Sequence, residues 1–159
     1  AKKLINFQSQ INEIYISNIR KPIDRNLYST FISFMPEKKA FSNIKKKNDV
    51  RGNFVEFLKS KDCGQVSLFT INKNQERGGH YHNSKVEKFL IIKGNAKIIF
   101  KNIASNKYFF RKVTEKNLCI FHSIPGWVHT IKNVGNSEIV GIVWANEIFN
   151  EKRTDTFYK

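Results

Sequence analysis

Cysteine is scarce in this chain of 159 residues, which contains only Cys63 and Cys119, far apart and outside any Cys-x-x-Cys spacing. Two such residues do not make a disulfide framework, so we expect reduced thiols and a cytoplasmic location. The sequence also lacks a run of about eighteen apolar residues, which argues against a membrane-spanning helix. It does not open with the charged and then apolar stretch of a secretory signal peptide.

Acidic residues are also few, with 13 Asp and Glu against 28 Lys and Arg, giving a formal net charge of +15. Such an excess is typical of nucleic-acid-binding proteins. Here the basic residues are scattered, and Lys45-Lys46-Lys47 is their longest run. No helix-turn-helix, zinc-finger or ribonucleoprotein motif accompanies them. We therefore expect no nucleic-acid partner, and the charge suits a doubly charged diphosphate equally well.

Glycine is missing from the first fifty residues, since all eight lie between residues 52 and 141. In the glycine-free part, apolar residues recur at helical spacing: Leu4, Phe7, Ile11 and Ile14. Pro22 is predicted to close this helix. Asp24 is then the predicted N-cap of a second helix that stops before Pro36. These observations predict a helical appendage over residues 1–41, which has too little apolar surface to fold alone.

Short alternating segments follow one another from Asn53 onward, which indicates an all-β barrel or sandwich over residues 42–159. The predicted strands are Phe54–Lys59, Gln65–Lys73, Val86–Lys93, Ala96–Ile103, Lys107–Val113, Leu118–Phe121, Val128–Val134 and Glu138–Ala145. Gly94-Asn95 has the composition of a two-residue hairpin turn. Pro125-Gly126 marks another turn.

Three of the four histidines fall into a spaced pattern with one glutamate: His80, His82, Glu87 and His129. Side chains two apart on a strand point to the same face, so His80 and His82 should converge, while Tyr81 faces away. A short turn is expected to place Glu87 near the two histidines, and His129 is expected to lie beside them on a second strand. Three imidazoles and a carboxylate form a ligand set for a divalent metal such as zinc, with room left for a bound molecule.

The same residues resemble the two motifs of the cupin family. His80, His82, Glu87 and Gly94 have the spacing of the first motif, and Pro125, Gly126, His129 and Asn133 that of the second. The second motif departs from the usual form, because its leading glycine is absent and Pro-x-Gly is contracted to Pro-Gly. The resemblance implies a jelly-roll barrel, also called a double-stranded β-helix, with a helical N-terminal appendage.

A narrower resemblance is to the C-terminal cupin domain of bifunctional capsular polysaccharide enzymes. The matching segments are Arg51–Glu56, Gly64–Ser67, Arg77–His82, Glu87–Phe89 and Trp144–Glu147. Those enzymes process UDP-4-keto-6-deoxy-N-acetylhexosamines on the way to UDP-N-acetyl-L-fucosamine. Their cupin domain holds zinc and epimerises the sugar, and their N-terminal half is a short-chain reductase. This chain has no Gly-x-x-Gly-x-x-Gly loop and no initiator Met, so we expect an excised or naturally separate cupin domain.

The dTDP-4-keto-6-deoxy-sugar 3,5-epimerases are more distantly similar, since they share Arg-Gly-x-Phe-x-Glu and Arg-Gly-x-His. This similarity implies that Arg51 and Arg77 contact a diphosphate and that Glu56 contacts the nucleotide. We add Gln65, from the matching segment above, as a fourth substrate-binding residue. His80 matches both the catalytic base of these epimerases and the first cupin ligand. We assign it to the metal, which leaves the catalytic base unassigned.

These resemblances imply a metal-dependent epimerase acting at carbon 3, beside the 4-ketone of a UDP-4-keto-6-deoxy-N-acetylhexosamine, in capsule or O-antigen sugar biosynthesis. They also imply a homodimer in which Arg51 and Glu56 serve the neighbouring subunit. Two alternatives remain open at this point. One is a cupin that binds a sugar nucleotide without catalysis, and the other is an iron-dependent cupin dioxygenase.

Overall fold

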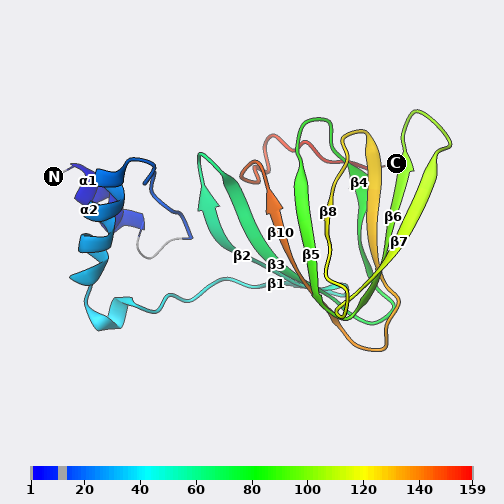
Figure 1. Cartoon of the computed structure of the whole chain (residues 1–159), viewed down its shortest axis with the longest axis horizontal. Coiled ribbons are helices and arrows are strands. Elements are labelled where there is room, and N and C mark those ends of the chain that lie inside the picture. The colour runs from blue at the N-terminus through cyan, green and yellow to red at the C-terminus, as the bar shows by residue number, and fades with distance from the viewer. Residues whose placement is uncertain (1, 11–13, 159) are drawn as a thin grey trace.

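The computed structural model describes residues 2–10 and 14–158, which form a helical N-terminal segment followed by strands (Figure 1). The helices are α1 (Lys2–Gln10), α2 (Pro22–Ser33) and the short 3-10 helix η1 (Glu37–Lys39). The strands are β1 (Lys47–Asp49), β2 (Gly52–Ser60), β3 (Gly64–Ile71), β4 (Glu76–Tyr81), β5 (Glu87–Lys93), β6 (Asn95–Asn102), β7 (Tyr108–Thr114), β8 (Ile120–His122), β9 (Trp127–Asn133), β10 (Ile139–Ala145) and β11 (Phe157–Tyr158). The predicted all-β fold with a helical N-terminal part is confirmed.

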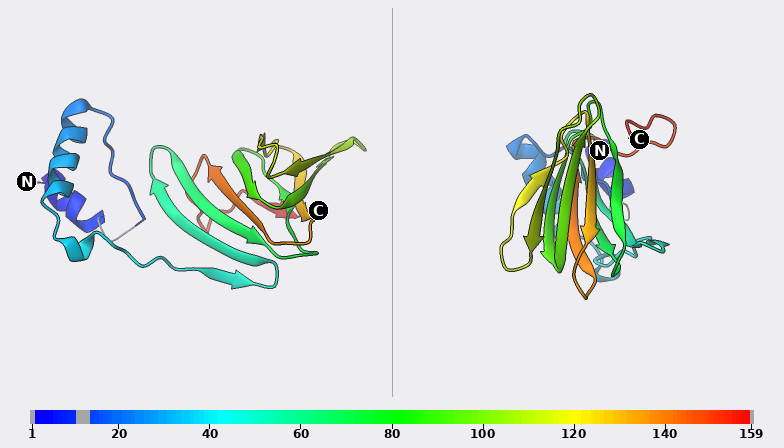
Figure 2. Two further views of the ribbon diagram at one scale, coloured as in Figure 1. Left: turned by 60° about the horizontal axis from the view of Figure 1, so that its bottom comes forward. Right: turned by 90° about the vertical axis from the view of Figure 1, so that its right-hand side faces the viewer.

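Two antiparallel sheets face each other and enclose the core (Figure 2). One sheet has the strand order β1-β2-β3-β10-β5-β8, and the other has the order β11-β4-β9-β6-β7. The core consists mainly of branched and aromatic side chains from both sheets: Phe69, Ile71, Phe89, Ile91, Ile98, Phe100, Val113, Ile131, Ile139 and Val143. Burial of this apolar surface is the dominant force that holds the two sheets together.

Strand β6 shows why the sequence pattern identifies the strands. Its residues Ala96, Ile98 and Phe100 are buried, while Lys97 and Ile99 between them are less so. Successive side chains of a strand point to opposite faces, so this alternation places one face against the core. The strand is paired on both sides, with β7 and with β9.

Gly94 does not form the predicted hairpin. The strands on either side of it, β5 and β6, belong to different sheets, so the turn carries the chain from one sheet to the other. The φ angle of Gly94 is 92°, a left-handed conformation that glycine adopts without strain. A Cβ atom there would lie 3.0 Å from the carbonyl oxygen of Glu138. Gly94 therefore does mark a turn that needs glycine, but this turn connects the two sheets and does not form a hairpin.

The helical segment packs around Phe7, which is only 3% exposed and contacts the rings of Tyr28 and Phe31. Two predictions about this segment are wrong. Pro22 opens α2 instead of closing α1, since its fixed φ suits the first turn of a helix. Asp24 lies inside the first turn of α2, after the N-cap Lys21, and is paired with Lys3 of α1.

The chain between the two helices docks on the end of β2. The amide of Ile16 donates to the carbonyl of Lys59 (2.7 Å), and the amide of Lys59 donates to the carbonyl of Ile14 (2.6 Å). Arg20 pairs with Asp62 at 3.0 Å. Ile14 therefore lies outside α1, contrary to the prediction, while Ile11 lies outside the described residues. The division of the chain at residues 41 and 42 stays a prediction.

Among the described residues, none of the helices is long and apolar enough to cross a membrane.

Candidate metal centre

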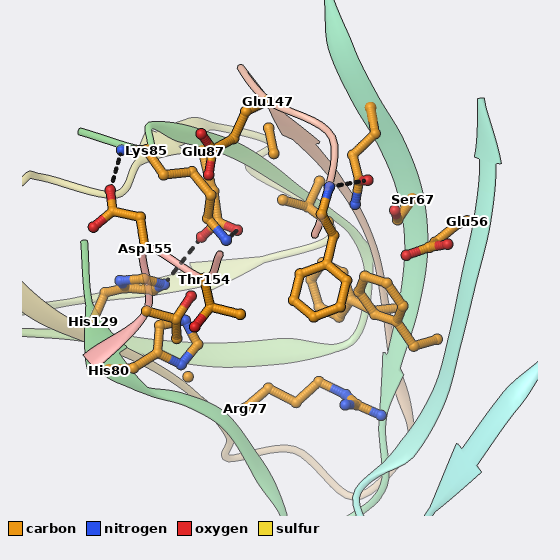
Figure 3. Close-up of a pocket in the computed structure, with 18 of the residues that line it drawn as sticks. Glu56, Ser67, Arg77, His80, Lys85, Glu87, His129, Glu147, Thr154 and Asp155 are labelled. Atoms are coloured by element: carbon orange, nitrogen blue, oxygen red, sulfur yellow. Dashed lines mark hydrogen bonds and ion pairs between the residues drawn. The ribbon is translucent and has the colours of Figure 1, made fainter. Parts of the chain in front are cut away.

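Four side chains with metal-binding groups meet between the two sheets, where Glu87 on β5 faces His80 on β4, His82 just after the end of β4, and His129 on β9. One ligand atom from each lies within 4.8 Å of the others. The Nε2 atoms of His82 and His129 are 3.2 and 3.3 Å from Oε2 of Glu87. Ligand atoms about 2.0–2.1 Å from one tetrahedral ion are about 3.3 Å apart, so these spacings fit a shared metal ion. Figure 3 shows His80, Glu87 and His129 in the cavity.

The pairing of β4 with β9 places His80 directly opposite His129. The register shifts between Gly78 and His80, where Gly79 is an extra residue on β4. Gly78 and Gly79 have φ angles of 99° and 74°. A Cβ atom on Gly78 would lie 2.4 Å from the carbonyl oxygen of His129. The two glycines thus allow a bulge that turns His80 toward the other ligands.

The charge states of the cluster suit a divalent cation. Burial, together with the neighbouring rings of His129 and His82, lowers the pKa of His80 to about 4, so the ring of His80 is neutral at pH 7. Burial raises the pKa of Glu87, but the ring nitrogens of His129 and His82 and the ammonium of Lys85 hold it well below its usual range. Neutral imidazoles and an ionised carboxylate are the forms that bind metal.

His82 has a defined tautomer, because its Nδ1 lies against the backbone carbonyl of Asp155. A carbonyl oxygen only accepts, so Nδ1 carries the proton. In the neutral ring, Nε2 then carries a lone pair that faces the carboxylate of Glu87 at 3.2 Å, and a cation bound between these two acceptors would make the contact favourable. The Nδ1 atoms of His80 and His129 are buried without a hydrogen-bond partner in the described part of the chain. The residues therefore fit a bound metal.

A cavity of about 350 Å³ opens beside the cluster, between the two sheets. All four predicted substrate-binding residues line it: Arg51, Glu56, Gln65 and Arg77. The sequence had suggested that Arg51 and Glu56 serve a neighbouring subunit. In this structure they reach the cavity of their own chain, since β2 pairs with β3 of the same barrel. One cavity therefore brings together the candidate metal ligands and the candidate substrate contacts.

The two arginines are held differently. Arg77 donates from Nε to the carbonyl of Thr70 at 2.9 Å and from Nη2 to the carbonyl of Asn53 at 3.3 Å. Its side chain is 14% exposed, and burial lowers its pKa. Arg51 is 48% exposed and pairs with Asp49, which raises the pKa of Arg51. Arginine has five N–H donors, so both guanidinium groups keep donors for a ligand.

Glu56 and Gln65 already have protein partners. Glu56 pairs with Lys59 at 2.9 Å and with Lys47 at 4.0 Å. The side-chain oxygen of Gln65 accepts a hydrogen bond from the backbone amide of Phe149 at 2.9 Å. Gln65 therefore anchors the C-terminal segment, a contact that the sequence did not suggest.

Sequence reasoning missed two features of the site. Lys85 is 13% exposed and lies 3.4 Å from Oε1 of Glu87, so it brings an ammonium group beside the cluster. The segment 146–158 lines the cavity through Phe149, Thr154 and Tyr158. The ring of Tyr158 lies 5.6 Å from that of His80. The segment has no motif spacing or long apolar pattern, and the only signal was the match over Trp144–Glu147.

Comparison with known proteins identifies the family of this chain. Residues 47–157 match the family model of the polysaccharide biosynthesis C-terminal domain. The chain is 40% identical over 157 residues to the UDP-2-acetamido-2,6-beta-L-arabino-hexul-4-ose reductase of Pseudomonas aeruginosa. This match covers 99% of the chain and 42% of the relative.

Solved structures are similar to this chain in fold. The capsular polysaccharide assembling protein CapF of Staphylococcus aureus superposes with a TM-score of 0.92 at 29% identity, over 99% of this chain and 46% of CapF. Oxalate decarboxylase of Lactobacillus farciminis superposes with a TM-score of 0.56 at 16% identity, over 67% of this chain and 32% of the decarboxylase chain. At this identity the similarity shows a shared fold alone.

The chain spans less than half the length of the reductase and of CapF. The cupin barrel predicted from the sequence is confirmed by these structures. Because the family model matches most of the barrel, this chain belongs to the polysaccharide biosynthesis C-terminal domain family.

Proposed function

We propose that this chain is a zinc-dependent epimerase that acts at carbon 3, beside the 4-ketone of a UDP-4-keto-6-deoxy-N-acetylhexosamine. The observation that carries the proposal is the shared cavity, which joins a buried His3Glu cluster to two arginines. The relative from Pseudomonas aeruginosa supports the substrate class, because its name describes a UDP-linked acetamido sugar with a ketone at carbon 4. CapF supports a place in capsule synthesis.

The chemistry explains why both features are needed. A proton beside a ketone becomes acidic when the negative charge that develops on the ketone oxygen is stabilised, and a divalent metal supplies this as a Lewis acid. His80, His82, Glu87 and His129 would hold that metal. Arg51 and Arg77 would bind the diphosphate, and remote binding of this kind orients the sugar ring. The buried rings of Phe69 and Phe89 in the cavity wall exclude water.

We propose that the reduction step takes place in another domain or another protein. This chain has no Gly-x-x-Gly-x-x-Gly loop for a dinucleotide. The reductase from Pseudomonas aeruginosa and CapF are each more than twice as long as the part that matches this chain. We propose that a short-chain reductase domain, joined to this chain or separate from it, is a functional partner. Epimerisation without reduction is therefore the activity that we assign to this chain.

The direct test is incorporation of solvent deuterium into a UDP-4-keto-6-deoxy-N-acetylhexosamine, followed by mass spectrometry. We expect exchange at carbon 3 that stops when a chelator removes the metal and returns when zinc is added. His82→Ala should abolish exchange, because the ligand set loses one imidazole. His122→Ala is the matched control, since His122 is exposed on β8 outside the cluster and should leave exchange unchanged.

Three other outcomes would contradict the proposal and support a different role for the chain or for its metal. Equal exchange with and without metal would make the metal structural. Substrate binding without exchange of any 4-keto sugar nucleotide would support a non-catalytic sugar-nucleotide-binding cupin. Bound iron with oxygen uptake would support a dioxygenase.

A further inference from the structure

The turn between two of the candidate ligands is held from outside the barrel strands. Residues 83–86 connect His82 with Glu87, and each of their four backbone amides donates to a side chain of the segment 146–155. Asn83, Ser84 and Lys85 donate to the carboxylate of Asp155, at 3.0, 2.7 and 2.7 Å respectively. The amide of Val86 donates to Oδ1 of Asn146 at 3.0 Å. The shape of this turn therefore depends on the C-terminal segment.

Asp155 also contacts a ligand directly. Its carbonyl oxygen accepts a hydrogen bond from Nδ1–H of His82, and its carboxylate accepts a further hydrogen bond from the hydroxyl of Ser84 at 3.0 Å. One residue thus sets the tautomer of His82 and the path of the chain toward Glu87. Outer partners of this kind fix the orientation of metal-bound imidazoles. In Figure 3, Asp155 lies beside Lys85 and above His129.

Other contacts attach the same segment to the barrel on both sides of Asp155. Before it, the amide of Phe149 is bound by Gln65. After it, β11 pairs with β4, where Tyr158 lies opposite His80 and the ring of Phe157 stacks on that of Tyr81 at 5.3 Å. Between these attachments, residues 150, 153, 154 and 156 line the cavity. A change in the conformation of the turn between His82 and Glu87 would therefore also shift the residues of this segment that line the cavity.

We infer that Asp155 is a positioning residue for the metal centre, and that the segment 146–158 is a strap whose attachment depends on the bound metal. Metal binding fixes His82 and Glu87, and thus the turn that Asp155 holds. The strap in turn pre-organises two of the four ligands. The effect is reciprocal, because two linked binding events stabilise each other equally. This inference rests on the metal centre of the proposed function and extends it to the cavity wall.

Zinc affinity gives the first test, measured by competition with a chromogenic chelator on the full chain. Both Asp155→Asn and Asp155→Ala keep the backbone carbonyl that contacts His82, but they change or remove the carboxylate that holds the amides of residues 83–85. Zinc binding should therefore weaken by about 10- to 100-fold, the range for changes to groups that support metal ligands. Glu151→Gln is the matched control, because Glu151 is an exposed acid of the same strap and should leave the affinity unchanged. Unchanged affinity in both Asp155 variants would overturn the inference alone. A wild-type chain that binds no zinc would overturn both this inference and the proposed function.

Limited proteolysis of the wild-type chain gives a second test that needs no variant. Trypsin can cut after Lys152 and Arg153, which are exposed on the strap. We expect zinc to slow cleavage at these sites several-fold compared with chelator-treated protein, while cleavage after the exposed Lys45 and Lys46 stays the same. Fragment masses identify each cut. Equal cleavage of the strap with and without zinc would overturn the proposed coupling.

Discussion

Arg51 and Arg77 line the same cavity, but their structural surroundings differ. The guanidinium of Arg77 is largely buried, bonds to two backbone carbonyls and lies 3.4 Å from Asp49. Arg51 is half-exposed and pairs with the same Asp49 more closely. We expect Arg51→Ala to raise KM with little change in melting temperature, because exposed ion pairs contribute about 0–1 kcal/mol. Arg77→Ala should raise KM and also lower the melting temperature, since two part-buried carbonyls lose a donor.

Steady-state kinetics and thermal unfolding of both variants check this expectation. A diphosphate contact remote from the reacting carbon acts similarly in the ground and transition states, so kcat should change less than KM. A loss confined to kcat for Arg51→Ala would contradict its role in binding.

The convergence of the four candidate ligand residues could be predicted because their spacing carries the information. His80, His82 and Glu87 are close in sequence, and His129 follows a Pro-Gly turn. The role of Asp155 could not be predicted in this way. It lies more than seventy residues from His82, and its position depends on the path of the C-terminal segment across the cavity. A single acidic residue in a polar stretch carries no spacing that would reveal such a contact.

The bulge in β4 places His80 opposite His129. Gly78 and Gly79 both have positive φ angles, but their surroundings differ, because a Cβ atom would meet the carbonyl of His129 only at Gly78. We expect Gly79→Ala to destabilise the fold by about 1 kcal/mol, the usual cost of a left-handed residue. Gly78→Ala should destabilise it by more and weaken zinc binding, because β9 must move away with His129.

Chemical denaturation and zinc titration of the two variants provide the measurement. They form a matched pair, since the same methyl group is added at neighbouring residues. Equal losses at both positions would show that backbone strain, and not contact with β9, governs the bulge.

At the level of elements, the alternating pattern predicted β2, β3 and β5 to β10 to within a few residues. Three strands had no predicted bounds, and one of them, β4, was expected only as the strand that carries His80 and His82. The segment Lys47–Asp49 has no apolar residue, β4 contains two glycines, and β11 spans only Phe157 and Tyr158. Each becomes a strand because a neighbouring strand offers it hydrogen-bond partners, which is information from the tertiary structure. The same reason explains Gly94. Its local sequence predicted a hairpin, but β5 and β6 pair with strands of different sheets, so the turn connects the two sheets.

The whole molecule is predicted to be a homodimer, and the edge of the first sheet is where we expect contact. Strand β1 pairs with only residues 52–54 of β2, and Phe57 is 39% exposed further along β2. We expect light scattering at micromolar concentration to give twice the mass of one chain. Phe57→Glu should shift the protein toward the monomer, because a carboxylate would be buried in the interface.

Phe110→Glu is the control for this prediction, since Phe110 is 50% exposed on β7 at an edge of the other sheet. It should leave the dimer intact. A wild-type protein with the mass of one chain would contradict the predicted dimer, and a monomer caused by Phe110→Glu would move the interface to the second sheet.

The uneven spread of the four candidate ligands along the chain has a consequence for assembly if they bind a metal as proposed. His80, His82 and Glu87 can meet around an ion before the barrel exists, whereas His129 arrives only when β9 pairs with β4. An ion could therefore load onto the denatured polypeptide, and binding to the denatured state reduces the stabilisation that ligand binding gives. Zinc should then raise the melting temperature by less than its affinity for the native protein implies. During synthesis, the ion could be captured by the nascent chain before its final ligand has been made.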